Sequence, residues 1–326
     1  MLLHGCPQAS SRASKETGVE QLQKQWGAPE LSYIEPVFRP PAEAGSLILQ
    51  VTNGCSWNKC TFCEMYTSEA KKFRLKPLEV LEHEITLIAR MGGGIEALNR
   101  VFLGDGDAMM LPFDRLVAIL GLINKHMPWV KRISSYCLPR NIRTKTVEQL
   151  NQLKAMGLTT LYVGCESGDN EVLSRIQKGE TFASSLDALN KIHAAGLKSS
   201  VMILTGLGGS ELSEQHALNS ALLVSSANPT YLSTLILTFP MGKERFVQNF
   251  TGFTELSPLE LLAENRKFIE ATDLKKTIFR SDHASNYLPL AGKSFSVSVC
   301  QKYVLCCFLC TFLSRSCPSD VRVCRL

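Results

Sequence analysis

The decisive stretch of this 326-residue sequence is Asn53-Gly54-Cys55-Ser56-Trp57-Asn58-Lys59-Cys60-Thr61-Phe62-Cys63. Its three cysteines, Cys55, Cys60 and Cys63, are spaced so that three thiolates can converge on one iron-sulfur cluster. Three protein ligands on a four-iron cluster leave one iron open. An open iron can bind and activate a substrate or cosubstrate, so this spacing predicts a cluster with a chemical role beyond carrying electrons.

Two other interpretations of the cysteines stay open at this stage. A structural zinc site needs a fourth Cys or His ligand. The nearest downstream histidine is His83 and the next cysteine is Cys137, so the neighbourhood of the stretch supplies no fourth ligand. The three residues can also be unrelated buried thiols, which pack as small hydrophobic side chains.

The same residues resemble the radical S-adenosylmethionine (radical SAM) enzymes. The cysteine-rich loop follows an apolar run, and an aromatic residue, Phe62, precedes the last cysteine. The resemblance implies that Cys55, Cys60 and Cys63 hold a 4Fe-4S cluster whose fourth iron is chelated by SAM. This sequence departs from the commonest family spacing, because four residues instead of three separate Cys55 from Cys60. The departure bears on Cys55 more than on the other two cysteines.

Composition agrees with a protein that has a substantial core and no broad affinity for nucleic acid. The chain is 45% hydrophobic, and of its net charge of +5 the last 34 residues carry +4, leaving +1 for residues 1–292. A body this close to neutral offers no electrostatic footprint for nucleic acid. Six of the twelve cysteines also lie in the last 27 residues, so the body has the sparse thiols of a reducing compartment.

The two ends differ from the body. The first 40 residues are expected to be a partly disordered N-terminal extension without a secretory signal, and an organellar transit peptide stays open as an alternative. The apolar stretch 303–313 is too short to cross a bilayer, which needs about 20 residues in a helix. We therefore expect a soluble intracellular, cytoplasmic protein without a membrane partner. The Cys-rich tail, residues 293–326, is expected to be irregular and unlike the closing segment usual in the family, and we interpret it as the product of an altered gene model or splice form. The alternative is a second metal site built from Cys306, Cys307 and Cys310.

Short β-rich runs alternate with longer amphipathic segments, which predicts parallel strands joined by crossover helices. The expected fold class is α/β, a partial (β/α)6 TIM-like barrel over residues 41–292, and the family resemblance implies the same architecture. The six predicted strands are 46–52, 98–103, 133–136, 159–163, 199–204 and 231–237. The predicted helices are about 77–90, 112–125, 147–156, two stretches ending near Gly179 and Gly196, and 211–225.

Unusual loops follow four of these strands, and the carboxyl ends of parallel strands meet at one mouth of a barrel. The cysteines follow the first strand, Gly104-Asp105-Gly106 the second, Glu166 the fourth, and Gly206-Leu207-Gly208 the fifth. We therefore expect these loops to ring one cavity.

The resemblance assigns roles to these loops. It implies that Gly104, Asp105 and Gly106 bind the amino group of SAM, through the backbone or the Asp105 carboxylate. Glu166 would bind the ribose hydroxyls, with a helix-capping acid as the alternative. Gly206, Leu207 and Gly208 would line the adenine, while a turn leading into a helix is the other role open to them.

The catalytic residue is unknown from sequence. His283 is the single candidate for a general acid or base, since it lies in the polar, aperiodic stretch 280–289, which we interpret as a loop over the barrel. Ser134, Ser135, Tyr136 and Arg140 follow the third strand and face the same mouth by position.

The predicted function is reductive cleavage of SAM to a 5'-deoxyadenosyl radical, which abstracts hydrogen from an unknown substrate. A one-electron donor such as a flavodoxin or ferredoxin would be the protein partner. The alternative is a non-catalytic iron-sulfur or zinc protein derived from this fold, which would have no use for SAM-binding loops.

Overall fold

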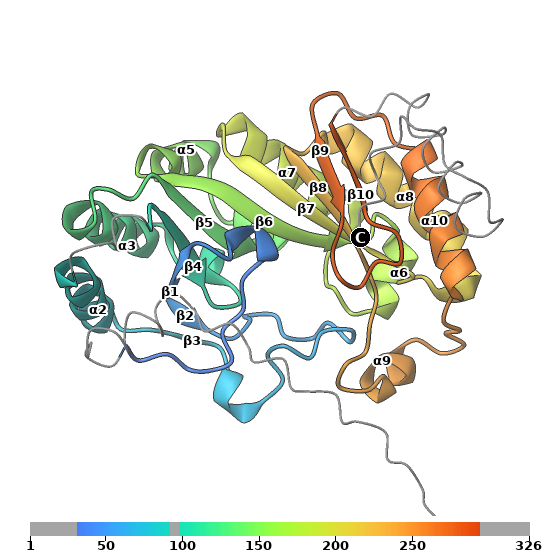
Figure 1. The fold of residues 1–326 in the computed structure, drawn as a ribbon, viewed down its shortest axis with the longest axis horizontal. Coiled ribbons are helices and arrows are strands. Elements are labelled where there is room, and N and C mark those ends of the chain that lie inside the picture. The colour runs from blue at the N-terminus through green and yellow to red at the C-terminus, as the bar shows by residue number, and fades with distance from the viewer. Residues whose placement is uncertain (1–30, 92–97, 294–326) are drawn as a thin grey trace, which may run out of the picture.

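The computed structural model describes residues 31–91 and 98–293. Its central sheet has eight strands in the order β1-β4-β5-β6-β7-β8-β9-β10 (Figure 1). Each neighbouring pair from β1 to β9 is parallel, and β10 closes the edge antiparallel to β9. The strands are β1 (Leu47–Gln50), β4 (Arg100–Gly104), β5 (Arg132–Cys137), β6 (Leu158–Glu166), β7 (Lys198–Thr205), β8 (Tyr231–Ile236), β9 (Ile278–Ser281) and β10 (Leu290–Lys293).

Helices connect the parallel strands and line the outer side of the curved sheet (Figure 1). A separate two-stranded sheet, β2 (Thr52–Asn53) with β3 (Arg74–Leu75), closes the base of the cysteine loop. The α-helices are α2 (Leu78–Arg90), α3 (Phe113–His126), α4 (Pro139–Arg143), α5 (Val147–Ala155), α6 (Asn170–Arg175), α7 (Phe182–Ala194), α8 (Gly209–Ala227), α9 (Glu244–Asn249) and α10 (Pro258–Glu270).

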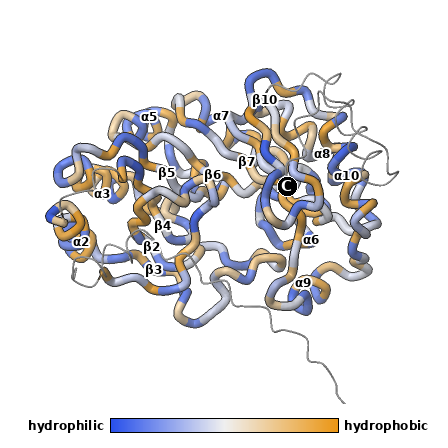
Figure 2. Tube along the Cα trace, viewed as in Figure 1, coloured by the Kyte–Doolittle hydropathy of each residue, from blue (hydrophilic) through white to orange (hydrophobic). Residues whose placement is uncertain are grey.

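The main core fills the space between the sheet and these outer helices. On α2 the buried apolar residues Leu81, Ile85 and Ile88 recur at helical spacing and face the sheet. In Figure 2 the outer helices carry both hydrophobic and hydrophilic stretches, as expected for helices with one buried face. Capping boxes start α5 at Thr146 and α10 at Ser257, where side chains satisfy backbone N–H groups that the helix leaves free.

The predicted α/β architecture is confirmed, and all six predicted strands are present. The expected loop 280–289 was wrong at its start, because residues 280 and 281 belong to β9 (Ile278–Ser281). Residues 282–289 form the connection to β10, which begins at Leu290. The four residues of β9 are too few to show a clear period, and the strand pairs with β8 through long-range contacts.

The predicted extension and tail lie largely outside the described residues, and so do Cys306, Cys307 and Cys310. The described end of the extension contacts the barrel. The backbone N–H of Ser32 donates to Glu84 of α2, and that of Ile34 donates to Gln50 of β1. Within the described part of the chain, no helix combines the length and the apolar character needed to span a membrane.

Glu43 closes the barrel at the end opposite the cysteine loop. Its carboxylate is fully buried and accepts hydrogen bonds from Arg132 Nη2 at 2.8 Å, Tyr162 Oη at 2.7 Å and Ser46 Oγ. Burial raises the pKa of Glu43, but these hydrogen bonds and the Arg132 charge together lower it below its usual 4.5. The folded state therefore holds the Glu43 carboxylate ionised more firmly than the unfolded state does.

We expect this carboxylate to make the fold acid-sensitive. A pKa lowered in the folded state stabilises the protein above the unfolded pKa, and that stability is lost as pH falls from about 4.5 through the folded pKa. Glu43→Gln should be less stable than wild type at pH 7 and should lose less stability on acidification. Urea unfolding at a series of pH values from about 6 to 3 measures this; parallel curves for the two proteins would contradict it.

Candidate functional site

The cysteine loop leaves the end of β2 and returns through β3, so the sheet edge anchors both of its ends. Cys60 is buried, Cys55 and Cys63 are half-buried, and all three are free thiols. The Thr61 N–H donates to the Ile176 carbonyl at 3.0 Å, which ties the loop to the end of α6. The loop thus lies at the carboxyl end of the barrel, where the sequence placed it.

Cys60 and Cys63 lie on one tight turn, since the Cys63 N–H donates to the Cys60 carbonyl at 3.2 Å. Burial is the main cause that raises the pKa of each thiol, that of Cys63 to about 11. The charge of Cys55 raises the pKa of both other thiols, and that of Cys60 raises the pKa of Cys63. Lys178 lowers the pKa of all three. The buried Lys178 ammonium, which lies 3.0 Å from Glu166 Oε1 and 5.8 Å from the Phe62 ring centroid, is therefore a cation beside the cysteine loop.

The four residues between Cys55 and Cys60 are held individually. Ser56 Oγ donates to the buried Asp107 carboxylate, which lies after β4. Asn58 adopts a left-handed backbone with φ 45°, a conformation that asparagine tolerates better than most residues, and its amide donates to the Tyr66 carbonyl at 2.8 Å. The longer spacing is thus absorbed by a tight turn at Asn58.

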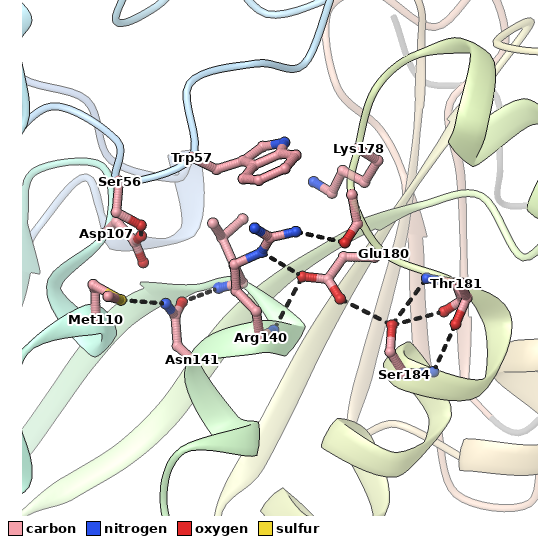
Figure 3. Close-up of polar contacts among 12 residues, drawn as sticks. Ser56, Trp57, Asp107, Met110, Arg140, Asn141, Lys178, Glu180, Thr181 and Ser184 are labelled. Carbon is pink, nitrogen blue, oxygen red and sulfur yellow. Dashed lines mark hydrogen bonds and ion pairs between the residues drawn. The ribbon is translucent and has the colours of Figure 1, made fainter.

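Trp57 anchors the same turn to the opposite wall of the site. Its indole N–H donates to the Gln177 carbonyl at 2.8 Å, and the Arg140 guanidinium lies 3.7 Å from the ring centroid. Arg140 in turn binds Glu180 through Nε at 2.9 Å and also donates to the Gly179 carbonyl. Figure 3 shows Trp57 over Arg140, with Lys178 and Glu180 beside them.

The loop after β4 packs directly on the start of the cysteine loop. A Cβ at Gly106, whose φ is +75°, would lie 2.4 Å from the Gly54 carbonyl oxygen, so only glycine fits there. The Asp105 carboxylate is buried and already bound to Lys71 at 2.6 Å and to the Tyr66 hydroxyl at 3.1 Å. The Asp105 backbone is committed as well, because its N–H donates to the Thr52 carbonyl at 3.1 Å and its carbonyl accepts from Thr52 Oγ1 at 2.7 Å and from the Asp107 N–H at 2.9 Å.

Glu166 does not cap the helix that follows it. It ends β6 with a φ of 66°, and Asp169 is the residue that caps α6 through its side chain. One Glu166 oxygen accepts from Lys178 Nζ at 3.0 Å. The other, Oε2, is buried and has no hydrogen-bond partner among the described residues. An unpaired buried carboxylate oxygen is costly, so this atom is available to a ligand.

The loop after β7 does not expose Leu207, which was expected to line the adenine of SAM. Gly206 donates its N–H to Glu264 at 2.6 Å, and Gly208 is the N-cap residue of α8. Leu207 is 0% exposed, in a second hydrophobic cluster between α6 and α9. Its side chain therefore cannot line an open site, whereas Met202 and Leu235 on the strands are only partly buried at the edge of that cluster.

Ser134, Ser135 and Tyr136 lie within β5 and not after it. Tyr136 is half-buried, and its pKa is raised by burial first and then by the charges of Asp105 and Cys63, so its ring lies near both loops. The Ser134 hydroxyl is buried without a hydrogen-bond partner in the described part of the chain, and that of Ser135 donates to backbone carbonyls.

The structure does not join His283 to the cysteine loop. Its ring is exposed in the turn between β9 and β10, where Nδ1 contacts Ser285 Oγ at 2.9 Å. Lys178 is the residue that sequence reasoning missed. It is buried against Glu166 and lies 5.8 Å from the centroid of the Phe62 ring, yet a lysine before Gly179 looks in sequence like any solvent-exposed helix-end residue.

The donor set suits a cluster better than a single ion. Among residues 31–91 and 98–293, no three His, Cys, Asp or Glu side chains lie close enough together to hold one metal ion. In a four-iron cluster each cysteine binds a different iron, so its ligands form a wider triangle than those of a zinc ion. The charge of Lys178 would offset the negative charge of three thiolates, and the free Glu166 oxygen gives a ligand on the cluster a second contact.

Comparison with known proteins agrees with this geometry. The model of the radical SAM superfamily matches residues 49–221. Heme chaperone HemW of Buchnera aphidicola is 21% identical over 235 residues, which cover 70% of this chain and 60% of that protein. A 4'-phospho-dehydrooxetanocin synthase of Priestia megaterium is 25% identical over 166 residues, or 47% of this chain and 22% of that protein. The chain thus spans less than two thirds of these relatives.

A solved structure supports the fold. Coproporphyrinogen III oxidase (HemN) from Escherichia coli, a radical SAM enzyme, superposes with a TM-score of 0.53 at 19% identity, over 69% of this chain and 52% of that chain. The matched family region runs from the first strand through the cysteine loop to α8 and is more than half of the sequence. This chain belongs to the radical SAM superfamily, whose members use a 4Fe-4S cluster and S-adenosylmethionine.

Proposed function

We propose that this chain is a radical SAM enzyme that holds a 4Fe-4S cluster through Cys55, Cys60 and Cys63 and cleaves SAM reductively. When bound, the cluster supplies one electron to SAM, whose cleavage yields methionine and a 5'-deoxyadenosyl radical able to remove hydrogen from a substrate. The observation that carries the proposal is the buried Lys178 ammonium beside a loop of three free thiols, bound to a Glu166 carboxylate whose second oxygen is buried and has no partner among the described residues.

The protein's own groups would bind and orient SAM. Burial lowers the pKa of Lys178, but the Glu166 carboxylate and the Cys60 thiolate raise it more, so the ammonium stays charged beside the cysteines. Glu166 Oε2 would accept from a ribose hydroxyl. The backbone carbonyls of Gly104 and Gly106 would accept from the amino group of SAM, since the Asp105 carbonyl already accepts two internal hydrogen bonds. Met202 and Leu235 would offer the apolar surface for adenine in place of Leu207.

The remaining assignments follow from this chemistry. The electron would come from a one-electron donor of the flavodoxin or ferredoxin class, and the free thiols suit a reducing compartment. The relatives act on different compounds, as the names heme chaperone and 4'-phospho-dehydrooxetanocin synthase indicate. The substrate therefore stays open.

We expect SAM cleavage by the full chain once the cluster is formed. The protein would be reconstituted anaerobically with iron and sulfide and reduced with dithionite, and 5'-deoxyadenosine formed from added SAM would be measured by chromatography. Deoxyadenosine above the level of a protein-free control supports the enzyme. A well-formed cluster without cleavage would support a non-catalytic iron-sulfur protein, and absence of any cluster would overturn the proposal.

A further inference from the structure

The segment between β8 and α10, residues 237–257, extends beyond the barrel and carries α9. In Figure 1, α9 lies apart from the outer row of helices, on the side of the molecule where the cysteine loop extends. We call residues 237–257 the arm. None of the roles proposed above for binding SAM involves the arm, so its contacts need their own explanation.

Aromatic packing fixes the arm to the barrel. Phe246 lies at the centre of four phenylalanines, with ring centroids 5.0 Å from Phe239, 5.5 Å from Phe250 and 4.7 Å from Phe253. These rings belong to the second hydrophobic cluster, which also contains residues of α6. The arm is thus a packed element rather than a loose connection, and it can hold a side chain in a defined place.

The second hydrophobic cluster reaches the cysteine loop as well. Phe62, which lies between Cys60 and Cys63, packs against it as a partly buried residue. At the far end of α9, Gln177 and Asn249 are hydrogen-bonded at 2.5 Å, and Gln177 also receives the Trp57 indole N–H through its carbonyl. The arm, α6 and the cysteine loop therefore meet in one place.

Arg245 makes the direct polar contact between the arm and the cysteine loop. Its Nη1 donates to the Cys63 carbonyl at 2.8 Å, and its Nη2 donates to the Asn58 carbonyl at 3.2 Å. The guanidinium also lies 3.7 Å from a Glu64 carboxylate oxygen and is two-thirds buried, with 33% of the side chain exposed. Two carbonyls that flank the Cys60–Cys63 turn are thus bound to one rigid, planar group.

We propose that Arg245 is a positioning residue that fixes the Cys60–Cys63 turn for cluster binding, a proposal that rests on the function proposed above. Asn58 forms the turn within the longer spacing after Cys55, and Cys63 would be the last ligand. A guanidinium donates in a fixed fork, so binding both carbonyls sets the distance between them. A lysine has a single point of donation and cannot fix two acceptors in the same way.

The test compares Arg245→Lys and Arg245→Gln with wild type and with Lys243→Met. Lys243 lies on the same arm in an exposed ion pair with Glu255, so its replacement is a matched control that leaves the cysteine loop untouched. In apo protein, the rate at which iodoacetamide alkylates Cys63 would be followed by peptide mass spectrometry. In reconstituted protein, iron release to a chelator and the electron paramagnetic resonance spectrum of the reduced cluster would be recorded.

In both Arg245 variants, iodoacetamide should alkylate Cys63 about tenfold faster than in wild type, and the reconstituted protein should release iron about tenfold faster. The reason is that the substitution removes hydrogen bonds from a charged donor. The spectrum should change as well, and Lys243→Met should match wild type. Alkylation and iron release at the wild-type rate in both variants would overturn the proposal. If the Arg245 variants are alkylated faster but the protein never forms a cluster, Arg245 would still be shown to fix the Cys60–Cys63 turn. The proposed function would then be refuted.

Discussion

Alanine at Cys55, Cys60 or Cys63 is expected to abolish SAM cleavage in each of the three single variants. The cluster would need all three thiolates, because the described residues around the loop offer no further cysteine that could replace one: Cys137 and Cys165 are buried in the main core. Replacing a residue that hydrogen-bonds to a metal ligand typically lowers metal affinity or activity about 10- to 100-fold, and the loss of a ligand itself should lower them further. Deoxyadenosine formation should therefore fall more than about 100-fold, together with the iron content.

Cys55→Ala is the informative member of this set, since the spacing after Cys55 departs from the common pattern. The structure turns the chain tightly at Asn58 and brings Cys55 within electrostatic reach of Cys60 and Cys63. We therefore expect Cys55→Ala to be as inactive as Cys60→Ala. Cys137→Ala, which removes a buried thiol on β5, is the control and should retain the cluster. Full cluster content in Cys55→Ala would show that Cys55 is not a ligand.

The sequence predicted the parts of this fold that depend on local pattern. β6 and β7 are runs of apolar and β-branched residues between glycines and helices, and both appear within a few residues of their predicted bounds. The loops that follow the strands converge because parallel strands end at one edge, which is a property of the topology. β9 escaped prediction because its four residues pair through β8, which no local signal records.

The site was less predictable where it depends on which way a side chain points. Leu207 lies in a loop of the expected kind, but its side chain turns into the second hydrophobic cluster. Lys178 and Arg245 reach the cysteine loop from segments far away in sequence, at separations that have no period or motif. The Asp105 carboxylate was one of two groups expected to bind the amino group of SAM, yet it is paired with Lys71 from the far end of the cysteine loop.

That buried pair carries the second large expected effect. Lys71 and Asp105 are both fully buried, with 2.6 Å between Nζ and Oδ2, and Lys71 also donates to the Ile34 carbonyl at 2.5 Å. Replacing Lys71 by methionine keeps most of the side-chain volume and removes the charge. Asp105 would then be a buried carboxylate with only the Tyr66 hydroxyl as a side-chain donor. Breaking a buried pair in this way costs about 3–5 kcal/mol.

Urea unfolding of the apo protein would measure the loss, with Lys72→Met as the control. Lys72 is the next residue and is paired with Glu69, but its side chain is 72% exposed, so its removal should change the free energy of unfolding by less than about 1 kcal/mol. The double variant Lys71→Met/Asp105→Asn should be less destabilised than the sum of the two single variants, because the penalty comes from the charge left alone. An additive double variant would mean that the two side chains act independently. Because this pair joins the cysteine loop to the loop after β4, the single variant Lys71→Met should also lose iron faster than Lys72→Met.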